Sequence, residues 1–107
     1  MSTSENSQFD AIENLIFTEG LRIGALDFHP DRDMMLVILN TNAVLNLNLS
    51  SFPSLRNADK SKLLEYKLVG EGTGVHWPLL DEDLSLKGFL QSELRKVVKT
   101  DKGSVAA

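Results

Sequence analysis

A histidine and a run of three acidic residues lie close together in the second half of this chain. His76 could serve as a general base or a metal ligand, and Asp81, Glu82 and Asp83 carry the oxygen ligands that divalent cations prefer. Consecutive acidic side chains project in different directions, however, and rarely converge on one ion. No Ser, Cys or second His forms a triad-like pattern with His76. We therefore assign no catalytic residue and no metal ligand, and expect the carboxylates to start and cap a following helix.

A glycine-rich segment, Gly70-Glu71-Gly72-Thr73-Gly74, precedes the histidine. A phosphate-binding loop must lead directly into a helix whose N–H groups face the anion, whereas Val-His-Trp-Pro follows here and cannot start one. We therefore expect Gly72 and Gly74 to permit a tight bend, and we expect no cofactor. Trp77 is the only tryptophan, and we expect its ring to close the core with the indole N–H bonded to a backbone carbonyl.

Extended segments are predicted before and after this loop. Residues 21–28 are expected to be extended, and Met34–Leu39 is apolar on both faces, as in a central strand covered on both sides. Residues 43–49 alternate between leucine and mostly polar residues, which indicates a half-buried antiparallel strand. Two shorter extended pieces are expected at residues 68–69 and 75–77. The first three segments predict an antiparallel meander.

Helices are predicted around this meander. Apolar residues at helical spacing indicate one helix over about residues 9–18. A second is expected over about 58–66 with Asn57 as its N-cap, and a third over about 86–98, capped by Ser85. The fold class is therefore α+β, with a small antiparallel β-meander sheet packed against two or three short helices.

Length and composition indicate one globular domain. The chain has 107 residues, of which 42% are hydrophobic and 24% charged. We expect a disordered tail at residues 1–8, a single α+β domain over 9–99 and a frayed C-terminal tail at 100–107. Cysteine is absent, the N-terminus is not a secretory signal, and no apolar run approaches the roughly 20 residues that span a bilayer. We therefore expect a cytoplasmic protein without membrane contact.

Charge is unevenly distributed along the chain. The net charge is −4, but residues 86–107 hold five basic and two acidic residues, a net +3, which leaves −7 for residues 1–85. An acidic body disfavours direct nucleic-acid binding, because contacts to phosphates supply most of that affinity. The basic residues are expected to complement the dipole at the end of the last helix.

Residues 70–90, taken together, closely resemble the hallmark of a bacterial and phage family catalogued as domain of unknown function 2442. In that family Gly-aliphatic-His-Trp-Pro is followed by Asp-Glu-Asp-aliphatic-Ser and a short closing helix, which match residues 74–78 and 81–85 here. The resemblance spans roughly residues 21–91. It implies a compact α+β domain, alone or joined to a helix-turn-helix domain, and it carries over no catalytic or ligand residue.

Stand-alone members of that family often have a neighbouring gene for another small protein, an arrangement reminiscent of toxin–antitoxin pairs. This resemblance and the absence of a nucleophile favour a non-catalytic protein-binding or regulatory module, whose partner is another small protein or a second copy. We place its surface near the glycine loop and the Asn46/Asn48 face. The alternative is a small metal- or ligand-binding domain or enzyme that uses the histidine and the acidic run. The candidate functional motif comprises Gly72, Gly74, His76, Trp77, Asp81, Glu82 and Asp83.

Overall fold

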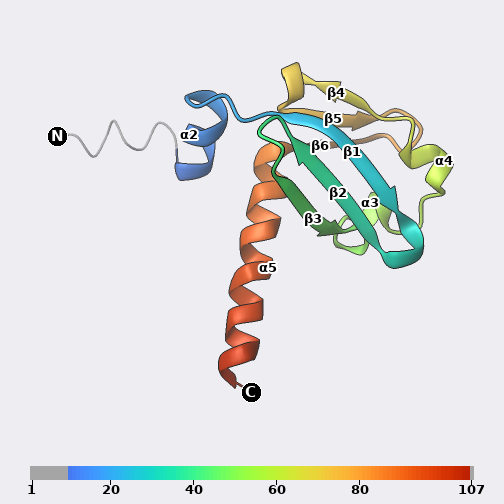
Figure 1. The fold of residues 1–107 in the computed structure, drawn as a ribbon. Helices are drawn as coiled ribbons and strands as arrows, with labels where there is room; N and C mark the ends of the chain where they lie inside the picture. Colours follow the sequence, from blue (N-terminus) through green and yellow to red (C-terminus); the bar gives the residue numbers. More distant parts are fainter. Residues whose placement is uncertain (1–9, 107) are drawn as a thin grey trace.

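Two small antiparallel sheets, four α-helices and three short 3-10 turns make up the part of the chain that the structure describes. The computed structural model describes residues 10–106, and for residues 99–106 only the course of the backbone. The helices are α2 (Ala11–Phe17), α3 (Pro53–Arg56), α4 (Lys60–Leu63) and α5 (Leu86–Ala106) together with short 3-10 turns, and the strands are β1 (Ile23–His29), β2 (Met34–Leu39), β3 (Val44–Asn48), β4 (Lys67–Val69), β5 (Gly74–Trp77) and β6 (Glu82–Ser85). The long helix α5 projects away from the body (Figure 1).

The first sheet is the predicted meander, in the order β1-β2-β3. Both pairings are antiparallel, so that Val37 of the central strand lies between Leu26 and Leu45. Along β2 and β3 every second residue is buried, which places one face of each strand on the core. The alternation of leucine with polar residues in β3 thus identified the buried face correctly.

The other face of this sheet is more open than the sequence suggested. Met34, Leu36 and Ile38 of β2 are only half-buried and do not belong to the core cluster. Within residues 10–106, Figure 1 shows no helix or strand in front of this face. The prediction that β2 is covered on both sides is therefore wrong for the described part of the chain, and an apolar strip remains in contact with water.

The second sheet has the order β4-β5-β6. Strands β4 and β5 confirm the two short extended pieces that were predicted. Strand β6 corrects the interpretation of the acidic run, because Glu82 and Asp83 lie in a strand and do not cap a helix. Asp81 adopts a left-handed conformation (φ 51°) in the turn after β5, and this reversal returns the chain along the β5 edge. Pairing with β5 then satisfies the backbone groups on the inner edge of β6.

The helix predicted over residues 58–66 is also corrected. Pro53 starts α3 one turn earlier than expected, because its fixed φ suits the first position of a helix. Asn57 is the C-cap of α3 and not the N-cap of a helix, and α4 follows as a separate turn after Asp59. The split allows one leucine from each helix, Leu55 and Leu63, to reach the core.

The N-termini of the longer helices are capped by side chains. Asp10 caps α2 in a capping box with Glu13, whose backbone N–H donates to Asp10 at 2.8 Å. The Ser85 hydroxyl accepts the Gly88 N–H of α5 at 3.0 Å, which confirms the predicted cap. Helix α5 continues to Ala106, well past its predicted end near residue 98.

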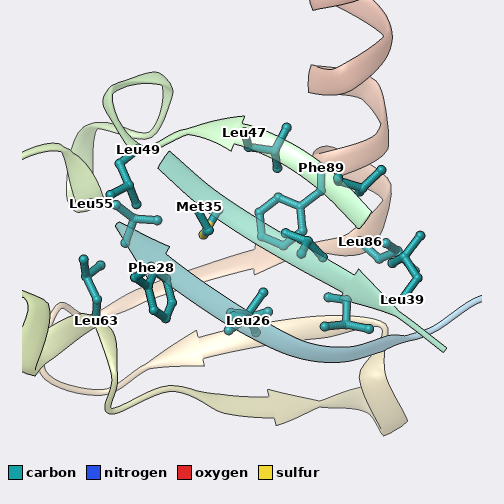
Figure 2. Packing of buried hydrophobic residues seen from close by; sticks show 14 of the residues in the cluster. Leu26, Phe28, Met35, Leu39, Leu47, Leu49, Leu55, Leu63, Leu86 and Phe89 are labelled. Atoms are coloured by element: carbon teal, nitrogen blue, oxygen red, sulfur yellow. The ribbon is translucent and has the colours of Figure 1, made fainter. Parts of the chain in front are cut away.

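The core lies between the two sheets, the short helices and the start of α5. Figure 2 shows Phe28 and Met35 of the first sheet beside leucines from α3 and α4, with Leu86 and Phe89 entering from α5. All four named side chains are fully buried. The tail expected at residues 1–8 lies outside the described residues, and the division into domain and tails stays a prediction. Among the described residues, no helix has both the length and the apolar character needed to cross a membrane.

Candidate functional site

The candidate motif lies on the second sheet and in the turns at its ends. The glycine turn precedes β5, the histidine and tryptophan lie on β5, and the acidic run occupies the next turn and β6. Cross-strand pairing sets His76 opposite Asp83 and Trp77 opposite Glu82. Because successive side chains of a strand point to opposite faces, the histidine and the tryptophan have separate environments.

Trp77 belongs to the core. Its side chain is fully buried, and its Nε1 donates a hydrogen bond to the carbonyl oxygen of Leu63 at 3.0 Å. The ring also meets Phe28 edge to face, with ring centroids 6.4 Å apart. Both parts of the sequence prediction, burial and an indole bond to a backbone carbonyl, are confirmed. The residue holds the two sheets together.

His76 faces the solvent side of the second sheet. Its Nδ1 lies 2.8 Å from Oδ1 of Asp83, and the two side chains are 34% and 74% exposed. Lys67 is the cross-strand neighbour on the other side. A side-chain contact this exposed contributes about 0–1 kcal/mol to stability. Of the motif residues predicted to supply chemistry, His76 and Asp83 alone are joined by a hydrogen bond between two side chains among the described residues.

The hydroxyl groups beside this pair are already hydrogen-bonded. Thr73 Oγ1 donates to the carbonyl oxygen of Gly70 at 2.9 Å, and Ser85 Oγ caps α5. His76 therefore has no hydroxyl nucleophile at hydrogen-bond distance among residues 10–98. A Ser-His-Asp arrangement needs the hydroxyl to donate to the imidazole, and residues 10–98 do not form this arrangement around His76.

The acidic run does not assemble a cation site in the structure. Asp81 lies in the turn, and Glu82 accepts the backbone N–H of Asp83 at 3.0 Å. In the described part of the chain no three His, Asp or Glu side chains gather in a way that could hold a metal ion. The alternative function built on His76 and the acidic run therefore gains no support from the geometry.

The glycine turn is a tight bend that packs on β1. Gly70, Glu71 and Gly72 all have positive φ, of 58°, 57° and 95°. A Cβ atom at Gly72 would lie 2.8 Å from the carbonyl oxygen of Ile23, too close without movement of the backbone. The next residue, Thr73, accepts the N–H of Leu86 at 2.9 Å. The turn thus fixes the start of β1 against the start of α5.

The proposed surface that combined the glycine turn with the Asn46/Asn48 face is not a continuous one. The turn packs at β1, whereas both asparagines lie on β3, and β1 and β3 are the opposite edges of the first sheet. The β3 edge lies instead beside α5, where Lys96 donates a hydrogen bond to the carbonyl oxygen of Asn46.

A hollow of about 420 Å³ lies between β3 and α5. We call it the β3–α5 hollow, and it is lined by Leu47, Asn48, Ser51, Ser92, Arg95 and Lys96. The sequence analysis did not find this site. Its only signals were the basic residues of the last helix and the exposed asparagines of β3, and their proximity depends on the course of α5.

An ionic cluster joins α2 to α5. Lys87 Nζ lies 2.8 Å from Glu13 and 3.2 Å from Asp10. The hydrogen bond from Lys87 lowers the pKa of Glu13, and the bond from the Glu13 backbone N–H lowers the pKa of Asp10. The same carboxylates, Glu13 foremost, raise the pKa of Lys87. Each shift favours the charged form, so the cluster ties the N-terminal helix to α5 at neutral pH.

A family model described as protein of unknown function (DUF2442) matches residues 23–94. The chain belongs to this family. The matched range contains both sheets, the whole candidate motif and the first part of α5, which confirms the resemblance seen in residues 70–90. The wall of the β3–α5 hollow falls mostly within the match, whereas Arg95 and Lys96 lie immediately beyond it.

Two solved structures share the fold of this DUF2442 domain. An uncharacterised protein from Chromobacterium violaceum, solved by NMR, is 22% identical, with a TM-score of 0.63 over 85% of this chain and 78% of that chain. A protein of unknown function from Rhodospirillum rubrum, solved by crystallography, is 25% identical, with a TM-score of 0.59 over 66% of this chain and 86% of that chain. No curated protein matches the sequence significantly. These likenesses establish the α+β fold and assign no activity.

Proposed function

We propose that this DUF2442 domain is a non-catalytic protein-binding module, and that the projecting part of α5 is its main contact surface. The observation that carries the proposal is an apolar stripe on α5. Leu94, Val97 and Val98 are 54%, 47% and 57% exposed. We call these three residues the α5 stripe.

The α5 stripe continues the side of the helix that is buried closer to its start. With 3.6 residues per turn, Leu94 and Val97 follow Leu86 and Leu90 along one face. Leu86 is fully buried and Leu90 packs against the core, so this face is covered where α5 crosses the body. Beyond the body the same face meets water. A helix that keeps its apolar face after leaving its own domain favours a partner that covers it.

The outer face of the first sheet offers a second apolar surface. Leu36 and Ile38 are half-buried there, and Val44 of the neighbouring strand is 51% exposed. Sheets that are apolar on both faces usually have both faces covered. The stripe and this face together could supply the roughly 800 Å² per partner of an ordinary protein interface.

We place the partner among proteins, either another small protein in an antitoxin-like pair or a second copy of this chain. A nucleic-acid partner is disfavoured because residues 1–85 carry a net charge of −7. The absence of cysteine fits an encounter in the reducing cytoplasm.

The test is reconstitution of the complex from purified components. Tagged protein from the native host identifies candidate partners, and sedimentation of the purified pair, or of the chain alone, measures association. Leu94→Glu should abolish association, because it places a charge in the stripe. The matched control is Leu79→Glu, at a residue that is 59% exposed in the turn after β5. The proposal would be contradicted if the chain stays monomeric and binds no purified candidate. It would also be contradicted if Leu94→Glu leaves the affinity of the complex unchanged.

A further inference from the structure

We propose that the β3–α5 hollow binds a compact oxyanion, a phosphate group being the simplest case. Two of its lining side chains are the cations Arg95 and Lys96, and three more, Asn48, Ser51 and Ser92, are neutral hydrogen-bonding groups. None is acidic, although acidic residues outnumber basic ones by 15 to 11 in the whole chain. A hollow with this lining selects for negative charge.

Helical spacing brings the α5 residues of the hollow together. Ser92, Arg95 and Lys96 stand at positions i, i+3 and i+4 and therefore share one face of the helix. The α5 stripe lies on the opposite face, so the two surfaces are separate. Anion binding in the hollow does not depend on the proposed protein contact and can be measured without a partner.

Part of the hydrogen-bonding capacity of the hollow is unused, although the Asn48 side chain donates to the carbonyl oxygen of Asp33 at 3.3 Å. Within residues 10–98 the Arg95 guanidinium and the hydroxyls of Ser51 and Ser92 make no hydrogen bond or ion pair. Lys96 is engaged by Asn46 and by Glu93, whose carboxylate lies 3.3 Å from its Nζ. Arg95 is thus the principal ligand, since its planar fork can donate two parallel bonds to a phosphate. The serine hydroxyls can donate to the remaining oxygens.

The helix dipole does not account for these cations. The sequence analysis placed them in the last turn of a helix ending near residue 98, where positive charge is favourable. Helix α5 instead continues to Ala106, and the dipole's influence is confined to the last turn. Arg95 therefore stands near the middle of the helix, with the β3 edge beside it.

The probe is inorganic phosphate, titrated into the full chain at constant ionic strength with chloride as the balancing anion. We expect saturable NMR shifts of the Ser51 and Ser92 amides and of the Arg95 side-chain N–H. Phenyl phosphate should bind at the same residues, which tests whether the hollow accepts a phosphate carried on a larger molecule. Shifts that follow ionic strength alone, or that spread over all lysines and arginines, would overturn the proposal.

Variants separate a specific site from general attraction. Arg95→Gln should weaken phosphate binding at least tenfold, Arg95→Lys should restore part of it, and Ser92→Ala should weaken it less. The matched control is Arg32→Gln, which removes an exposed arginine next to β2, outside the hollow. Equal affinity for Arg95→Gln and the wild type would overturn the assignment, and circular dichroism verifies that each variant is folded.

Discussion

Trp77 and Leu63 are joined by a hydrogen bond of 3.0 Å from the indole nitrogen to the backbone carbonyl oxygen, although they belong to different layers of the fold. Trp77 lies on β5, Leu63 ends α4, and the indole ring packs edge to face on Phe28 of β1. One side chain therefore ties both sheets to a short helix. The residue that makes the motif distinctive acts in packing, which directs the search for function to other surfaces.

Truncation of this tryptophan should be among the most damaging single changes. Trp77→Ala is expected to cost about 3–5 kcal/mol of unfolding free energy, because it removes a fully buried ring. Trp77→Phe retains an aromatic ring but leaves the Leu63 carbonyl oxygen without its donor, which costs about 1–3 kcal/mol. Urea unfolding measures both. The wild-type emission should be that of a buried indole, and a readily quenched, water-exposed indole in the folded protein would contradict this account.

The cap of α5 provides a second prediction. Ser85→Ala removes the acceptor of the Gly88 N–H bond and should cost about 0.5–2 kcal/mol. Asp83→Ala removes only an exposed contact with His76, with an expected cost below about 1 kcal/mol. Comparison of the two unfolding free energies distinguishes the serine cap from capping by the acidic run. A larger loss for Asp83→Ala would restore the original interpretation of that run.

The glycine turn makes a third prediction, with a control in the same chain. Gly72→Ala must accommodate a Cβ atom 2.8 Å from the Ile23 carbonyl oxygen at a φ of +95°. Gly20 has a similar φ of +82°, but a Cβ atom there would have nothing within 4 Å. Gly20→Ala should therefore cost only the left-handed strain of roughly 1–2 kcal/mol. Gly72→Ala should cost clearly more, and equal losses by urea unfolding would show that the contact with β1 is relaxed easily.

Much of the fold follows from local patterns. The apolar run of Met34–Leu39 indicates a strand but not which of its faces is buried, whereas the alternation around Leu45 and Leu47 identifies the core face of β3, so the meander was predictable. The burial of Trp77 was predictable as well, because a ring of that size is seldom exposed to water. These features depend on neighbours along the chain or on the size of one side chain.

The missed features depend on contacts between distant segments. Asp81-Glu82-Asp83 has the composition of a helix start, and only the free edge of β5 makes it a turn and a strand. The β3–α5 hollow exists because α5 runs beside β3, so that Arg95 and Asn48 line the same hollow, and no local spacing encodes this proximity. Sequence reasoning therefore located the motif of residues 70–85 but not the β3–α5 hollow, where Arg95, Ser51 and Ser92 have hydrogen-bonding groups without partners among residues 10–98.

The ionic cluster between α2 and α5 predicts how stability changes with pH. Asp10 and Glu13 have lowered pKa values in the folded protein. Their contribution to folding stability is therefore complete above the pKa values of the unfolded chain, about 4–4.5, and is lost as the pH falls through the pKa values of the folded protein. Lys87 has a raised pKa, so its contribution is complete below about 10.5 and is lost as the pH rises through its folded value. The melting temperature should therefore fall at both extremes.

Lys87→Gln separates the two carboxylates. The hydrogen bond from Lys87 is the main cause of the Glu13 shift, whereas the Asp10 shift comes mainly from the backbone N–H of Glu13. The variant should lower the melting temperature at neutral pH. The fall of the melting temperature at high pH should become smaller, because Lys87 no longer contributes to it. The fall at low pH should become smaller but persist, because the capping box of Asp10 remains. Lys62→Gln, at an exposed lysine of α4, is the control and should reproduce the wild-type profile. A Lys87→Gln profile parallel to the wild type would show that the cluster does not stabilise the docking of α2.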